Sequence, residues 1–120
     1  MEELTKQEEE VMLHVWKFKS CTIKQVREVM PEPKPPYTTL ASVINKLKRK
    51  QFLSAIQEGI TYVYAPKVKK SEYKKAYMSK FVDDYFKNSF REMVSFFAKE
   101  QKISPKELKD IIKEIEKGKK

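Results

Sequence analysis

Small polar and cationic side chains recur at helical spacing between residues 37 and 50. Thr38, Ser42, Asn45 and Arg49 step by four, three and four positions, so on a helix they share one face. Hydroxyl and amide groups arranged in this way can bond the edges of bases, and asparagine can form a bidentate pair with adenine. The chemistry that this spacing predicts is hydrogen bonding along a DNA major groove.

Neighbouring residues extend this candidate DNA-binding set. Thr39 joins Thr38 at the helix start, where free N–H groups favour a phosphate. Lys46 is suited to guanine or to the backbone, and the cations at the far end of the helix are expected to clamp phosphates. Each residue alone also fits an ordinary solvated helix face, and only the combination with the rest of the chain favours DNA. The predicted set is Thr38, Thr39, Ser42, Asn45, Lys46, Arg49 and Lys50.

Residues for catalysis or metal binding are scarce. His14 is the only histidine and lies in an apolar helical pattern, while Cys21 has no cysteine partner, so no zinc or iron–sulfur spacing can be written. Gly59 and Gly118 are the only glycines, which excludes a glycine-rich phosphate loop. The sequence therefore predicts no enzyme, no catalytic residues, no metal and no cofactor.

Two short helices are expected before the polar helix. Thr5 with Glu8, and Thr22 with Gln25, have the spacing of capping boxes that begin helices. Four prolines between residues 31 and 36 then stop the chain from continuing as a helix. The third helix, at residues 37–50, carries an apolar stripe opposite its polar face, made by Leu40, Val43, Ile44 and Leu47.

A different periodicity follows at residues 52–65. Two β-prone runs flank Glu58 and Gly59, where glycine can supply the positive φ of a tight hairpin turn. Three short helices followed by a hairpin is the order of a winged helix-turn-helix. Because Glu58 would repel phosphate, we expect few contacts from the wing, made through Gln57 or Thr61.

The chain is expected to be helical again from Ser71, in three helices. Eight of its 14 aromatic residues lie between Tyr73 and Phe97, more than three short helices can bury by themselves. We therefore expect a homodimer, since a helix-turn-helix reader usually needs two half-sites. The predicted dimerisation residues are Tyr77, Phe81, Tyr85, Phe90, Val94, Phe97, Leu108, Ile111, Ile112 and Ile115.

The aromatic residues and the winged helix also fit other functions. An aromatic pocket near Tyr77, Phe81 and Phe90 would make the protein a regulator that responds to a small molecule. The aromatic residues also fit packing against the N-terminal half of the chain, and a winged helix can serve as a protein-interaction module without binding DNA.

Composition and charge set the frame for these predictions. The 120 residues carry a net charge of +9, but residues 1–66 contribute only +2, so bulk charge does not locate a DNA-binding face. No apolar run is long enough to span a bilayer, and the acidic N-terminus is unlike a secretory signal. Cys21, the single cysteine, cannot form an intramolecular disulfide. We therefore expect a cytoplasmic protein. The expected architecture is mainly α, with a winged-helix DNA-binding domain at residues 1–70 and a helical dimerisation domain at residues 71–120.

Several motifs resemble the bacterial penicillinase-repressor family, which includes the repressors of β-lactamase and methicillin-resistance genes. They are LTxxExxVMxxVW from Leu4 to Trp16, YTTL from Tyr37 to Leu40, VINKLKRKQFL from Val43 to Leu53, and YVYAP from Tyr62 to Pro66. The resemblance implies a homodimeric transcriptional repressor that binds a palindromic operator through its third helix and dimerises through its C-terminal helices.

The resemblance also bears on release from DNA. Many family members have a membrane sensor protease as a partner, and they are cleaved at an Asn–Phe bond in the dimerisation region. The aligned pair here is Phe96 and Phe97, which is therefore the candidate protease-sensitive bond, with a membrane sensor protease as the candidate partner. The asparagine of the pair is missing, which counts against induction by proteolysis and against a role in antibiotic resistance. Copper sensing is also disfavoured, because the C-terminal cysteine cluster of the copper-responsive branch is absent.

Overall fold

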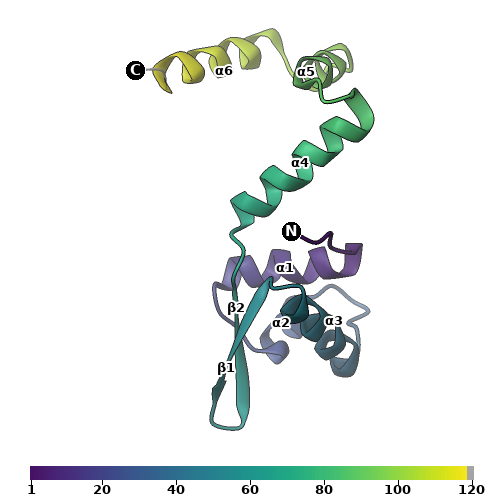
Figure 1. The fold of residues 1–120 in the computed structure, drawn as a ribbon, viewed down its shortest axis with the longest axis vertical. Coiled ribbons are helices and arrows are strands. Elements are labelled where there is room, and N and C mark those ends of the chain that lie inside the picture. Colours follow the sequence, from purple (N-terminus) through teal and green to yellow (C-terminus); the bar gives the residue numbers. More distant parts are fainter. Residues whose placement is uncertain (119–120) are drawn as a thin grey trace. The chain divides into compact units, whose positions relative to one another are not determined.

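A computed structural model describes residues 1–118 of the chain (Figure 1). It confirms the predicted class of fold, which is mainly α with one β-hairpin. Three short helices and the hairpin form a winged helix-turn-helix, and three further helices follow. The elements are α1 (Lys6–Phe18), α2 (Ile23–Val29), α3 (Tyr37–Arg49), β1 (Leu53–Glu58), β2 (Thr61–Pro66), α4 (Lys70–Phe86), α5 (Phe90–Lys99) and α6 (Pro105–Gly118).

Capping side chains fix where the first two helices begin. The Thr5 hydroxyl accepts the N–H of Glu8, and the Glu8 carboxylate accepts the N–H of Thr5, so both halves of the predicted capping box are present. Thr22 and Gln25 form the same reciprocal pair at the start of α2. Each box satisfies N–H groups that a helix start leaves without an intrahelical partner.

The winged-helix core lies between α1, α2, α3 and the base of the hairpin. Helix α3 buries the whole of its predicted apolar stripe, in contact with side chains from both other helices. Phe52 and Leu53, which follow α3, complete the core and are also buried. This packing leaves α3 only its opposite face for solvent or a partner. The α3 side chains in the core are Leu40, Val43, Ile44 and Leu47.

The hairpin is an antiparallel pair in which Leu53 faces Pro66 and Glu58 faces Thr61. Gly59 has a φ of 63°, the left-handed conformation predicted for its turn. A bridge between Cys21 and Tyr64, with hydrogen bonds in both directions, ties the hairpin to the chain between α1 and α2. The hairpin projects beyond the three helices (Figure 1).

The chain divides into two compact units, the first ending at Ala76 and the second beginning at Tyr77. The boundary falls inside α4, whose first turns belong to the winged-helix unit. There the Tyr73 ring lies 5.6 Å from the Trp16 ring and 5.8 Å from the Phe52 ring. Tyr73 is half-buried and packs against the core of the first unit. The predicted division into domains 1–70 and 71–120 stays a prediction.

The second unit contains the rest of α4 together with α5 and α6. Ser89 caps α5 by accepting the N–H of Glu92. Ser104 and Glu107 form a reciprocal pair at the start of α6. Across residues 1–118, none of the helices is both long enough and apolar enough to cross a membrane.

Candidate nucleic-acid interface

The polar face of α3 is open to solvent. Thr38, Ser42, Asn45 and Arg49 are all exposed on the side of the helix that faces away from the core, and Lys46 is exposed beside them. Thr39 is half-buried. The structure therefore places these predicted residues on one accessible surface, which we call the α3 polar face.

The N-terminus of α3 is suited to an anion. Pro36 occupies the N-cap position, and no side chain caps the helix. Its first turn contains no acidic residue. The positive end of the helix dipole is therefore not offset by a nearby carboxylate, which favours a phosphate there.

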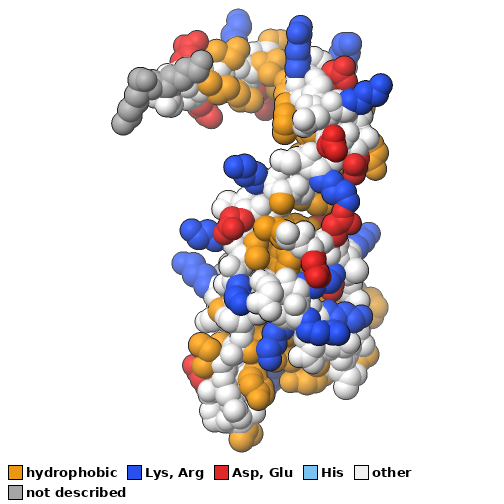
Figure 2. Space-filling model, in the orientation of Figure 1, with side chains coloured by type: hydrophobic (Ala, Val, Ile, Leu, Met, Phe, Trp, Pro, Cys, Tyr) orange, Lys and Arg blue, Asp and Glu red, His pale blue; other side chains and the backbone are white. Residues whose placement is uncertain are grey.

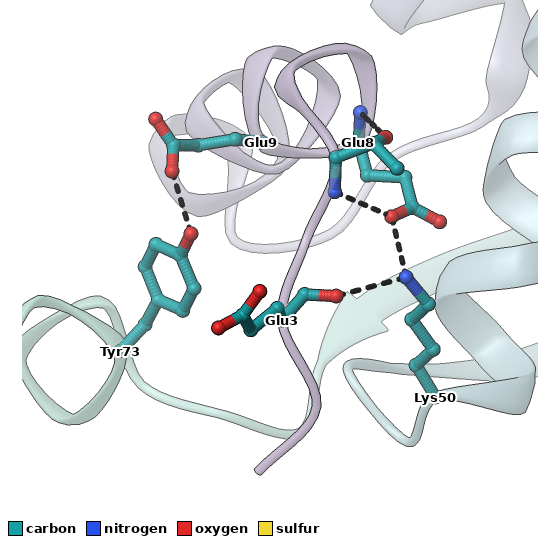
Figure 3. Close-up of polar contacts among 6 residues, drawn as sticks. Glu3, Glu8, Glu9, Lys50 and Tyr73 are labelled. Carbon is teal, nitrogen blue, oxygen red and sulfur yellow. Dashed lines mark hydrogen bonds and ion pairs between the residues drawn. The ribbon is translucent and has the colours of Figure 1, made fainter. Parts of the chain in front are cut away.

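Lys50 lies in a different environment from the one predicted for it. Its Nζ atom donates to Oε1 of Glu8 at 2.7 Å and to the carbonyl oxygen of Glu3 at 2.9 Å (Figure 3). The Lys50 side chain is 23% exposed and that of Glu8 is 3% exposed. This ion pair would have to open before Lys50 could bind a phosphate. A phosphate contact by Lys50 therefore stays a prediction, and we do not include Lys50 among the proposed DNA-contacting residues.

Glu8 is the buried carboxylate of this arrangement. Burial by itself would raise its pKa, but the hydrogen bond from Lys50, the N–H of Thr5 and the positive charge of Lys50 outweigh burial and lower the pKa below its usual 4.5. The neighbouring Glu9 accepts a hydrogen bond from the Tyr73 hydroxyl (Figure 3). Through these two acids, α1 bonds both the end of α3 and the start of α4.

The wing presents more apolar than cationic surface. Gln57, Glu58 and Thr61 are exposed near the turn, and the small number of DNA contacts expected from the wing stays a prediction. Ile60 at the turn is 100% exposed, and Ile56 is 64% exposed. Hydrophobic surface is visible at this end of the hairpin in Figure 2. The β-prone run before Glu58 predicted a strand, but it did not show that Ile56 would lie exposed on that strand.

A groove lies where the C-terminal end of α3 meets the base of the hairpin. Its volume is about 550 Å³. Asn45, Lys48 and Arg49 of α3 line it, together with Gln51, Ser54 and Lys67. Lys48 and Lys67 lie outside the predicted DNA-binding set, although Lys48 is one of the cations at the end of the helix that were expected to clamp phosphates. The sequence did not place Lys67 at this site, because Lys67 follows β2 and only the fold brings it beside α3.

The C-terminal unit exposes most of the residues predicted to form a dimer. Among residues 77–118, Val82 alone is buried. Figure 2 shows hydrophobic side chains at the surface of α5 and α6. Five of the predicted dimerisation residues are half-exposed or more: Tyr77, Tyr85, Phe90, Ile112 and Ile115. Val94 and Ile111 are 37% and 45% exposed, and Phe81, Phe97 and Leu108 are intermediate.

The bond aligned with the family's cleavage position lies inside a helix. Phe96 and Phe97 are consecutive residues of α5, and their rings are 5.5 Å apart. Phe96 is exposed and Phe97 is half-buried. Proteases cut most readily at exposed loop tips and locally unfolded segments, so a helical bond is a poor substrate until α5 opens. Cleavage at this bond stays a prediction.

These features define a class of protein. A three-helix core, an antiparallel wing and a polar third helix that faces away from the core make up a winged helix-turn-helix of the DNA-binding type.

The comparison with protein families makes the identification more specific. The family model described as penicillinase repressor matches residues 4–117, so the chain belongs to the penicillinase repressor family. This membership places it among DNA-binding repressors, which are regulators and not enzymes.

Individual relatives agree with this membership. The penicillinase repressor of Bacillus licheniformis is 24% identical over 111 residues, covering 92% of this chain and 87% of the relative. The solution structure of the DNA-binding domain of the repressor BlaI is similar with a TM-score of 0.53 and 26% identity. That match covers 59% of this chain and 88% of the BlaI domain.

Proposed function

We propose that this protein is a homodimeric transcriptional repressor of the bacterial cytoplasm that binds a palindromic DNA operator. In this proposal α3 enters the major groove of each half-site, and the unit that begins at Tyr77 joins two copies. No cofactor takes part. Repression follows because a dimer bound at the operator occupies DNA that the transcription machinery needs.

The two faces of α3 carry the proposal. Because its apolar stripe is fixed in the core, the α3 polar face has a fixed orientation relative to the rest of the winged-helix unit. A rigid helix that presents hydroxyls, an amide and cations is what base reading in a major groove requires. The proposed reading residues are Thr38, Thr39, Ser42, Asn45 and Lys46, with Arg49 on the backbone.

The exposed apolar residues of the C-terminal unit support the dimer. Helices α5 and α6 each place large side chains in solvent when the chain is alone. Contiguous apolar surface of this kind usually marks an interface. A second copy would cover it, and two-fold pairing would present two copies of α3 to a symmetric operator.

Selection of bound sequences from a random duplex pool tests the proposal. The full-length protein should enrich a motif with two-fold symmetry, because each copy reads one half-site. Enrichment of an asymmetric motif would remove the symmetric dimer, and no enrichment at any salt concentration would remove sequence-specific DNA binding.

A further inference from the structure

The groove at the C-terminal end of α3 has the charge and the position of a phosphate site. Three of its lining residues, Lys48, Arg49 and Lys67, are cationic, and none is acidic. Within residues 1–118, the side chains of Lys48 and Arg49 have no hydrogen-bond or ion-pair partner. Their charges are therefore available to an anion.

Compensation of the helix dipole explains only part of this charge. Cations in the last turn of a helix are stabilised by its C-terminal carbonyls, which accounts for Lys48 and Arg49. Lys67 lies beyond β2, and its Nζ atom donates to Oε1 of Gln51 at 2.6 Å. A lysine from a separate segment is thus held at the same groove.

Gln51 accepts the hydrogen bond from Lys67, and its own backbone has an unusual conformation. The N–H of Gln51 bonds the carbonyl of Lys48, and the N–H of Phe52 bonds that of Leu47, which together end α3 in a Schellman motif. Gln51 occupies the left-handed position of this motif, with a φ of 67°. Glycine adopts this conformation without strain, whereas a side chain is disfavoured there. What the glutamine provides in exchange is the amide that bonds Lys67.

We propose that this groove binds a phosphate of the DNA backbone, with Lys67 and Lys48 as contacts and Gln51 as the residue that positions Lys67. The inference rests on the proposed function, because Asn45 belongs both to the groove and to the α3 polar face. A duplex whose bases reach Asn45 brings its backbone to the edge of that face. The groove therefore fixes the register of α3 on the duplex and carries no sequence preference of its own.

The test measures affinity against salt concentration for Lys67→Ala and Gln51→Gly, on the selected operator and on an unrelated duplex. Each phosphate contact contributes about 0.9 to the slope of log affinity against log salt, so Lys67→Ala should flatten the slope by about 1.8 for a dimer. Affinity should fall by a similar factor on both duplexes. Lys69→Ala is the matched control, since Lys69 is an exposed lysine two residues away that does not line the groove.

Gln51→Gly separates positioning from folding. It removes the strained side chain, so the melting temperature should rise by a few degrees. It also releases Lys67, so the slope should flatten and the affinity should fall on both duplexes. A more stable protein that binds less tightly is not expected if Gln51 serves folding alone.

Two outcomes would overturn the inference. One is an unchanged salt slope for Lys67→Ala; if pyrophosphate then binds the free protein in calorimetry and Lys67→Ala abolishes that binding, the groove takes a free phosphate ligand and not DNA. The other is an equal loss for Lys69→Ala, which would assign the effect to overall charge. In each case the wild type still selects its operator, so the proposed function survives; a wild type that binds no duplex would overturn both.

Discussion

Asn45 is the side chain of α3 whose chemistry is best suited to distinguishing one base pair from another. It is exposed at the middle of the α3 polar face, and its amide can donate and accept at once. Asn45→Ala should weaken binding to the selected operator by roughly 10-fold or more, since a bidentate base contact contributes about 1–3 kcal/mol of discrimination. Binding to an unrelated duplex should change little. Fluorescence anisotropy on both duplexes measures this difference, and Gln7→Ala on α1 serves as the control. Equal losses of affinity on the operator and on the unrelated duplex would exclude base reading by Asn45.

Glu8 is the residue whose charge state the fold controls most clearly. Its pKa is lower in the folded protein than the usual 4.5, so the unfolded chain binds a proton more readily than the folded one. The stabilisation is therefore complete above about pH 4.5 and is lost as the pH falls through the lower folded-state pKa.

Glu8→Gln should destabilise the protein at pH 7 by about 1–3 kcal/mol, because Lys50 loses its charged partner. The difference from the wild type should shrink as the pH falls below 4.5. Urea denaturation at pH 7 and pH 3 measures both effects, and Glu10→Gln, on an exposed acid of the same helix, should be nearly neutral. A difference that stays constant with pH would contradict the assignment of a lowered pKa.

At the scale of elements, α3 depends on the burial of its apolar stripe and not on a side-chain N-cap. It has no side-chain N-cap, and the side chains of its apolar stripe lie in the core. Leu47→Ala, next to the end of the helix, should destabilise the protein by about 2–5 kcal/mol through a cavity. Thermal melting gives the size of the loss, and Lys48→Ala on the exposed side should leave the melting temperature nearly unchanged. Similar melting temperatures for the two variants would mean that Leu47 is not in the core as described.

Local patterns predicted most of these elements. The Thr5–Glu8 and Thr22–Gln25 spacings gave correct helix starts, and Gly59 gave the correct turn, because each depends on residues a few positions apart. The apolar stripe of α3 gave its buried face for the same reason.

Contacts between distant segments could not be predicted in this way. The pairing of Lys50 with Glu8, the hydrogen bond from Lys67 to Gln51, and the packing of Tyr73 on Trp16 each join separate elements. No spacing in the sequence encodes such contacts. The left-handed backbone conformation of Gln51 could not be predicted either, because glycine is the residue favoured at that position.

At the scale of the whole molecule, the proposed dimer depends on the exposed apolar residues of the C-terminal unit. Ile112 of α6 is 53% exposed in the single chain, and a dimer would bury it. Ile112→Asp should therefore shift a micromolar sample from dimer to monomer, because a buried unpaired carboxylate is costly. Sedimentation velocity reports the shift. Lys113→Asp places the same side chain at an exposed position next to it and should leave the dimer intact.

The same variant links assembly to DNA binding. A monomer can occupy only one half-site, so Ile112→Asp should lose most of its affinity for the full operator while retaining weak, salt-sensitive binding. A wild type that sediments as a monomer at micromolar concentration would contradict the dimer.

Parallel selection from a random duplex pool, with the wild type and with Asn45→Ala, tests the central claim most directly. The wild type should yield a two-fold-symmetric motif, and Asn45→Ala should lose its preference at one equivalent position in each half. That result would show at once that two copies bind and that α3 reads the bases. An asymmetric wild-type motif, or the same motif from both proteins, would contradict the account.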